Sequence, residues 1–288
     1  AESFAEMGMA RSFYRAGPET VIEDFDAMPF YHASSDRYYE MSLRDGAYWF
    51  TRYRKDSEGA IYDRFETEVP WIMGSGNHVR VYIFRTPDGA LFQLPIGWYT
   101  QTDRWAMAPG YEMPDHSGVT REVSDGCMAC HNSYAELPAE AGHYGYETVF
   151  PEELPEGIGC QRCHGPGAGH VHMALTGEPE MDRLRAAIVQ PGKLENDKLY
   201  SVCYGCHMQP TVAVNAQFRL GRGAYSFRPG EEITEYLAHV DIVDPEMPKS
   251  DRFEINHHPY RMEQSACFTQ TEGLPGREQL GCLTCHDP

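Results

Sequence analysis

The stretch GCQRCHGPGAGHVH (159–172) places two cysteines and three histidines on a segment that is rich in glycine. It contains the pattern Cys-x-x-Cys-His at positions 160–164, and the chain repeats this pattern three more times. The other copies start at Cys127, Cys203 and Cys282. Together the four motifs use eight of the nine cysteines, and only Cys267 lies outside them. The structure and function of this part of the chain therefore depend on what the motif binds.

Cys-x-x-Cys-His is the attachment signature of c-type haem. Two thiols one short turn apart can each form a thioether with a vinyl group of the porphyrin, and the next residue projects an imidazole to the iron. The sequence therefore predicts four covalent haems. The expected attachment residues are Cys127, Cys130, Cys160, Cys163, Cys203, Cys206, Cys282 and Cys285. The expected proximal iron ligands are His131, His164, His207 and His286.

Other uses of paired cysteines fit the pattern less well. A structural zinc site is completed by a second Cys-x-x-Cys or by a separated pair of histidines, and it does not need a histidine directly after every pair. A thioredoxin-like redox motif occurs once, near a βαβ pattern. Zinc and disulfides remain the alternatives to haem.

Composition agrees with a chain that takes part of its core from bound cofactors. Only 41% of the residues are hydrophobic and the mean hydropathy is -0.53, which is a modest supply for a conventional core. Four porphyrins would add rigid apolar surface to the second half of the chain. We therefore expect the protein without haem to be largely unfolded there, because ligand binding and folding are then coupled.

The chain carries a formal net charge of -19, which argues against binding to nucleic acid or to an anionic membrane surface. A basic or neutral redox partner protein is a better match. No stretch approaches the roughly 18 to 20 apolar residues of a membrane span. The start AESFAEM (1–7) would suit a mature terminus left by signal-peptide cleavage. We expect an exported protein, either periplasmic or extracellular.

The two halves of the chain differ in pattern, and the expected class is α+β with much irregular structure. Residues 1–110 contain no cysteine, and the runs 37–53 and 79–99 alternate around Asp45-Gly46 and Asp88-Gly89. Such turns between alternating runs predict hairpins. We expect an N-terminal arm and a β-rich module of roughly four to six strands. Residues 111–288 are expected to form a tetrahaem cytochrome domain of loops and short helices, with helices predicted over 178–190 and 231–240.

Nine histidines lie outside the motifs, which is enough for a second imidazole on every iron. Local context favours His170 as one of these distal iron ligands. It follows His164 by six residues, after the stretch Gly-Pro-Gly-Ala-Gly. It is too near to reach the opposite face of its own haem easily, so we expect it to bind a neighbouring iron. Methionine is the competing distal ligand, but Met208 directly follows His207 and cannot reach the far side of that haem.

Several longer blocks resemble a group of bacterial multihaem c-type cytochromes. The blocks are CMACHNSY (127–134), GIGCQRCHGPGAGHV (157–171), SVCYGCH (201–207), FEINHHPYRM (253–262) and CLTCHDP (282–288). The group often carries tetratricopeptide repeats after its last haem site and is more distantly related to nitrogen-cycle multihaem cytochromes. Upstream segments resemble its β-rich lead-in. The resemblance implies distal ligands among His32, His78, His116, His170 and His257.

Three functions are open at this point. The first is electron transfer through closely packed low-spin haems. The second is the same activity in a self-associated polymer with a continuous haem chain, as in extracellular cytochrome filaments, with residues 1–30 as the exchanged arm. The third is an oxidoreductase acting on a small nitrogen or sulfur compound at one open haem. We identify no catalytic residues, because GSG (74–76) lacks the third glycine of a phosphate loop and Cys267 alone is more often a small buried hydrophobe.

Overall fold

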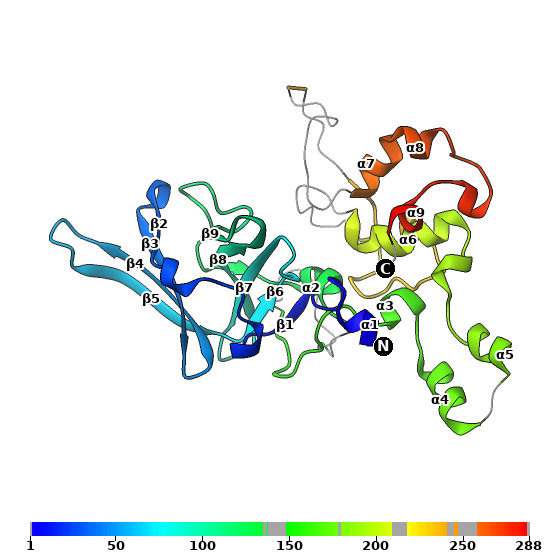
Figure 1. Cartoon of the computed structure of the whole chain (residues 1–288), viewed down its shortest axis with the longest axis horizontal. Coiled ribbons are helices and arrows are strands. Elements are labelled where there is room, and N and C mark those ends of the chain that lie inside the picture. Colours follow the sequence, from blue (N-terminus) through cyan, green and yellow to red (C-terminus); the bar gives the residue numbers. More distant parts are fainter. Residues whose placement is uncertain are drawn as a thin grey trace. The chain divides into compact units, whose positions relative to one another are not determined.

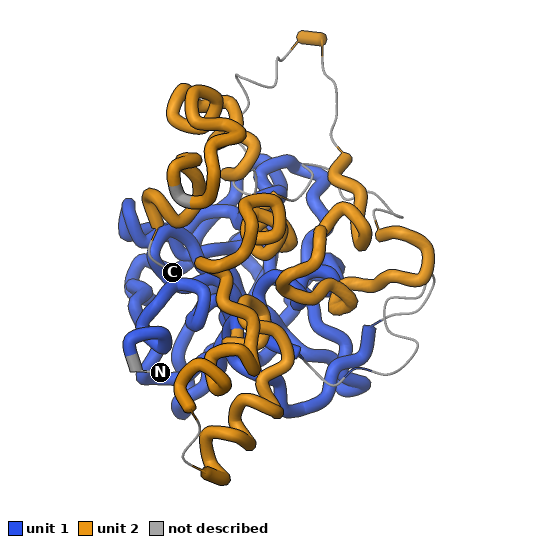
Figure 2. The backbone as a smooth tube through the Cα atoms, turned by 90° about the vertical axis from the view of Figure 1, so that its right-hand side faces the viewer, with its two compact units in different colours: residues 1–158 blue, residues 159–288 orange. Residues whose placement is uncertain are grey.

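The computed structural model describes residues 2–134, 137, 148–177, 180–208, 218–240, 245–246 and 258–286. The chain divides into two compact units, residues 1–158 and 159–288 (Figures 1 and 2). The first unit is built mainly from antiparallel strands, and the second from short helices and irregular segments. The expected mixed class, with a β-rich N-terminal region, is confirmed. Residues 111–158, which we assigned to the haem domain, belong to the first unit.

The strands of the first unit form two antiparallel sheets. Sheet A has the order β1-β6-β7-β8-β10, with β9 also paired to β8, and sheet B has the order β2-β3-β4-β5. The strands are β1 (Phe13–Arg15), β2 (Phe30–His32), β3 (Arg37–Arg44), β4 (Ala47–Lys55), β5 (Ile61–Val69), β6 (Trp71–Met73), β7 (Val79–Arg85), β8 (Leu91–Tyr99), β9 (Arg104–Met107) and β10 (Arg121–Glu122). The described residues thus form more strands than we expected, because several have only two to four residues and show no alternation.

Both predicted hairpins are confirmed. Arg44 pairs with Ala47 across a two-residue loop in which Asp45 and Gly46 have φ values of 52° and 84°. Positive φ at both positions is the geometry that matches the twist of the flanking strands. The second hairpin joins β7 to β8, where the amide of Gly89 donates to the carbonyl of Thr86 at 3.0 Å and Gly89 has a φ of 100°.

Sheet A is buried on both faces. Alternate residues contribute to different clusters: Ile72 and Tyr82 pack with sheet B residues such as Tyr39, whereas Trp71 and Ile83 pack on the opposite side. The second cluster also takes in Met128, Phe150 and Leu154 from the segment after the strands. This segment therefore covers the outer face of sheet A, and the period-two alternation of the strands decides which side chain meets which layer.

A charged pair is buried within the first unit. The Glu23 carboxylate accepts a hydrogen bond from Arg80 at 2.7 Å, and both side chains are almost fully enclosed. Tyr48 donates to Glu23 at 2.9 Å, Tyr82 donates to its other oxygen, and Arg80 donates to the Tyr14 hydroxyl at 2.6 Å. Such a pair is tolerated in a core because both Glu23 oxygens and both terminal nitrogens of Arg80 have partners, whereas Arg80 Nε has none among the described residues.

The helices are short. They are α1 (Glu2–Ala5), α2 (Asp125–His131), α3 (Gln161–His164), α4 (Ala168–Thr176), α5 (Met181–Ala186), α6 (Asn196–His207), α7 (His258–Gln264), α8 (Ala266–Thr269) and α9 (Cys282–Cys285). None of the helices in the described residues is long and apolar enough to cross a membrane.

The two helices predicted from sequence are only partly present. Of the range 178–190, α5 occupies six residues and ends at Ala186, while residues 178–179 lie outside the described part. The helix expected over 231–240 is wrong. Only Ile233–Glu235 form a single 3-10 turn, because the carbonyl of Tyr236 accepts from the amide of Arg219 at 2.8 Å and Leu237 pairs with Phe218 in an isolated bridge. The apolar residues Ile233, Tyr236 and Leu237 are nevertheless buried together.

Candidate functional site

The first Cys-x-x-Cys-His motif lies on α2, at the outer face of sheet A. Met128 and Ala129, the two residues between the cysteines, are buried, and Met128 packs in the same cluster as Trp71. Cys127 is exposed, and Cys130 is partly exposed. The helix therefore directs its apolar pair to the core and keeps the Cys127 thiol accessible.

The second motif forms one helical turn that ends at a glycine. The amide of His164 donates to the carbonyl of Cys160 at 2.9 Å, so the motif closes as an α-helical turn. Gly165 then takes a φ of 73°, which stops the helix. The His164 imidazole Nδ1 lies 2.8 Å from the carbonyl oxygen of Val189. Because a carbonyl only accepts, this contact requires the proton on Nδ1 and leaves the lone pair on Nε2.

The third motif ends α6, and the fourth coincides with α9. On α6, Cys203, Cys206 and His207 are spaced i, i+3 and i+4, which places them on one side of the helix. In the fourth motif the amide of His286 donates to the carbonyl of Cys282 at 2.9 Å. All four motifs thus adopt one helical turn, the conformation in which both thiols and the following imidazole can meet one planar group.

The third and fourth motifs lie against each other within the second unit. The side-chain amide of Asn196, at the start of α6, donates to Gln279 at 3.0 Å, three residues before the fourth motif. The thiols of Cys203 and Cys282 are within hydrogen-bonding reach of each other. Cys282 also lies 3.8 Å from the thioether sulfur of Met262 in α7.

All nine cysteines are free thiols. Burial, together with the neighbouring Cys206, raises the pKa of Cys163. The hydrogen bond with Cys282 is the main cause that raises the pKa of Cys203, and burial adds to it. Both thiols are therefore neutral near pH 7. The arrangement contains none of the disulfides that were one alternative use of these cysteines.

His170 is held in the same way as His164. It lies on α4, and its Nδ1 is 2.9 Å from the carbonyl oxygen of Leu184. Val189 and Leu184 belong to one stretch of chain, so the end of α5 and the residues after it orient both imidazoles. A hydrogen bond from Nδ1–H to a carbonyl is the usual support of a histidine that binds a metal through Nε2.

His32 and His116 lie side by side in the first unit, with ring centroids 5.9 Å apart. His116 Nδ1 accepts from the amide of Gly118 at 3.0 Å, so Nε2 carries the proton, and Nε2 lies 3.2 Å from the Tyr39 hydroxyl. Burial, followed by the nearby His32 and arginines, lowers the pKa of His116. In this arrangement His116 is a neutral, hydrogen-bonded imidazole. His32 Nδ1 lies 2.8 Å from the Ser35 hydroxyl, and its Nε2 is not used in that contact.

The remaining distal candidates have different surroundings. His78 is exposed in the turn that precedes β7. His257 lies outside the described residues. Its neighbour His258 begins α7, and its ring centroid is 6.2 Å from that of His207. The sequence offered two adjacent histidines here and no local signal to choose between them, so the proximity of His258 to a motif histidine was missed.

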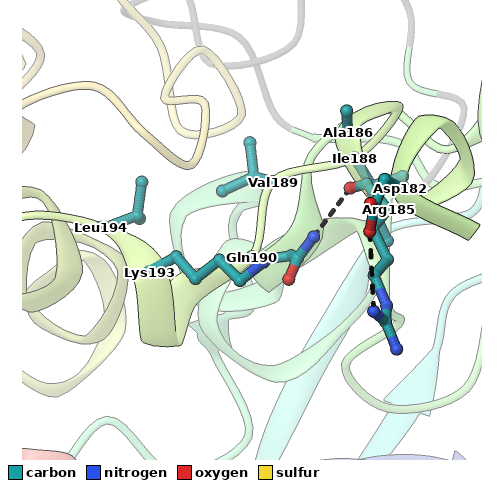
Figure 3. A pocket seen from close by; sticks show the side chains of 8 residues that line it. All are labelled: Asp182, Arg185, Ala186, Ile188, Val189, Gln190, Lys193 and Leu194. Carbon is teal, nitrogen blue, oxygen red and sulfur yellow. Dashed lines mark hydrogen bonds and ion pairs between the residues drawn. The ribbon is translucent and has the colours of Figure 1, made fainter.

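A cavity lies beside the segment that holds His164 and His170. Its volume is about 450 Å³, and it is lined by residues of α5 and of the chain that follows, from Asp182 to Leu194 (Figure 3). Gln190 donates to the carbonyl of Arg185 at 2.8 Å, and Arg185 is 3.9 Å from Asp182. Nowhere among the described residues, this cavity included, are three His, Cys, Asp or Glu side chains grouped to hold a metal ion.

Comparison with known proteins adds no family to this picture. No protein-family model matches the chain, and no solved structure matches it at a significant level.

Proposed function

We propose that the chain is a c-type cytochrome that carries four covalent haems and transfers electrons. The observation that carries the proposal is the shared form of the four motifs. Each places two free thiols one helical turn apart with a histidine directly after the second. Haem c, when bound, supplies an iron that takes up and releases one electron.

The side chains have distinct parts in this proposal. The eight motif cysteines form thioethers, and His131, His164, His207 and His286 offer an imidazole to iron. His164 is already oriented for this, because Val189 holds its Nδ1 and leaves Nε2 with a lone pair. The residues around the motifs thus fit haem c, and His164 would bind its iron without a change of tautomer.

Among the distal candidates, His170 has the strongest support, since Leu184 holds it in the same tautomer. His32 has Nε2 available, whereas His116 would have to change its tautomer and give up its present contacts before it could bind iron. We include His258 as a candidate beside His257 because of its distance to His207.

The charge of the chain points to the kind of redox partner. With a net charge of -19, the protein would attract a cationic protein and repel an acidic one, and the attraction would weaken with salt. Covalent haem attachment also accords with an exported protein.

The test is a set of cysteine variants of the purified chain. C160S/C163S should lose one of four haems, measured as the pyridine haemochrome and by the mass of the denatured protein. C267S, which changes the cysteine outside the motifs, should keep all four. An unchanged haem count in C160S/C163S would contradict attachment at the second motif.

A further inference from the structure

Residues 9–13, here called the N-terminal strap, join parts of the first unit that are far apart in sequence. The strap is fixed to sheet A, since the amide of Gly74 donates to the carbonyl of Ser12 at 2.7 Å and Phe13 begins β1 next to β6. Phe13 itself is fully buried. The strap is therefore part of the rigid body of the sheet.

The strap reaches the end of the first motif through one side chain. The Ser12 hydroxyl lies 2.7 Å from the carbonyl oxygen of His131, which is 119 positions away. It lies at the same distance from the carbonyl of Met9, so its single proton is shared between the two. His131 is the last residue of α2, and carbonyls at a helix end have no partner within the helix. Ser12 supplies that partner.

The same strap holds the chain that leads to the second motif. The amide of Gly157 donates to the carbonyl of Phe13 at 2.7 Å, and the amide of Ile158 donates to that of Met9 at 3.0 Å. Ser133, two residues after His131, donates to the carbonyl of Gly157 at 3.0 Å. The strap thus makes hydrogen bonds both to His131, the last residue of the first motif, and to the chain two residues before Cys160.

We propose that Ser12 is a positioning residue for His131. By holding the carbonyl at the end of α2, it prevents the last turn from fraying and fixes the direction in which the imidazole leaves the backbone. This role rests on the proposed function, because the direction of His131 matters only when haem is attached at Cys127 and Cys130. Ser12 is remote from the thiols in sequence, and no motif identifies it.

The test compares S12A and S12T in the full haem-loaded protein. After reduction with dithionite, carbon monoxide is titrated and its binding is followed in the Soret band. Loss of one hydrogen bond should raise the carbon monoxide affinity of about one quarter of the haem by roughly three- to tenfold and leave the rest as in wild type. S12T keeps the hydroxyl and should behave as wild type.

T20V is the matched control, because the Thr20 hydroxyl also donates to a carbonyl three residues back, at 2.8 Å, away from the motif. A haem-loaded S12A protein with unchanged carbon monoxide binding would overturn the role of Ser12 alone, even if its thermal stability fell. An equal change at all four haems would also overturn it. A wild-type protein without covalent haem would overturn the proposed function and this role together.

Discussion

His164 and Val189 are joined by a hydrogen bond of 2.8 Å between the imidazole Nδ1 and the main-chain carbonyl oxygen. His170 makes the equivalent bond to Leu184 at 2.9 Å. Both imidazoles therefore carry their proton on Nδ1 and present an Nε2 lone pair. One stretch of chain, 184–189, therefore orients both His164, the proposed proximal ligand, and His170, the best-supported candidate for a distal ligand.

H170A should convert one quarter of the haem from low spin to high spin, because one iron loses its second imidazole. H172A is the matched comparison, since His172 is exposed on the same helix and is not among the candidate ligands, and it should leave the spectrum unchanged. The ferric absorption spectrum and electron paramagnetic resonance measure both. An unaltered H170A spectrum would remove His170 from the ligands.

E23Q should destabilise the first unit by about 3–5 kcal/mol, because it leaves Arg80 buried without its counter-charge. Unfolding in urea can be followed by tryptophan emission, since all four tryptophans lie in this unit. E153Q removes one charge from the exposed ion pair of Glu153 with Arg15 in the same unit and should leave the unfolding midpoint unchanged. Equal midpoints for E23Q and wild type would show that the buried pair contributes no stability.

G157A should destabilise the first unit by at least about 1–2 kcal/mol, the cost of a left-handed residue with a β-carbon. Gly157 has a φ of 53°, and a β-carbon there would also overlap the Ala10 carbonyl. G167A is the control, because nothing lies within 4 Å of the corresponding β-carbon. The measurement is the thermal midpoint of each variant, and similar midpoints for the two would contradict the close packing at Gly157.

E66Q should reduce stability at neutral pH but not in acid. Hydrogen bonds from Arg44 and Thr51 lower the pKa of Glu66 below its ordinary value. A carboxyl with a depressed pKa in the folded state stabilises above its unfolded pKa and loses that contribution as the pH falls through the folded value. The thermal midpoints of E66Q and wild type should therefore differ at about pH 7 and converge as the pH falls below the ordinary pKa of a glutamate. A constant difference over this range would contradict a role of the ionised carboxylate.

The strand architecture was predictable where the signal was local. Asp45-Gly46 between alternating runs predicted the hairpin of β3 and β4, because only a few residue types accept positive φ at both positions. The helix expected over 231–240 was wrong, because the periodicity of a segment does not report its contacts with distant residues. Leu237 pairs with Phe218, nineteen positions earlier, and the carbonyl of Tyr236 accepts from the amide of Arg219 in place of a further helical amide.

The candidate site also has a part that local sequence predicts and a part that it does not. The thiols and the following histidine of each motif are neighbours in sequence, so spacing alone predicts that they act together. The candidate distal ligands depend on contacts between residues far apart in sequence, such as Leu184 beside His170 and His207 beside His258. The tautomer of His116 is fixed by a local contact, the amide of Gly118 two residues on, whereas its second contact, with Tyr39, lies 77 positions away and is not indicated by the sequence near residue 116.

The most direct test of four covalent haems is the intact mass of the purified protein under denaturing conditions, combined with iron and zinc analysis of the same sample. A tetrahaem protein has the mass of the polypeptide plus four haems, four iron atoms per chain and no stoichiometric zinc, and this is the expected result. A mass equal to the bare polypeptide, with zinc in place of iron, would contradict it.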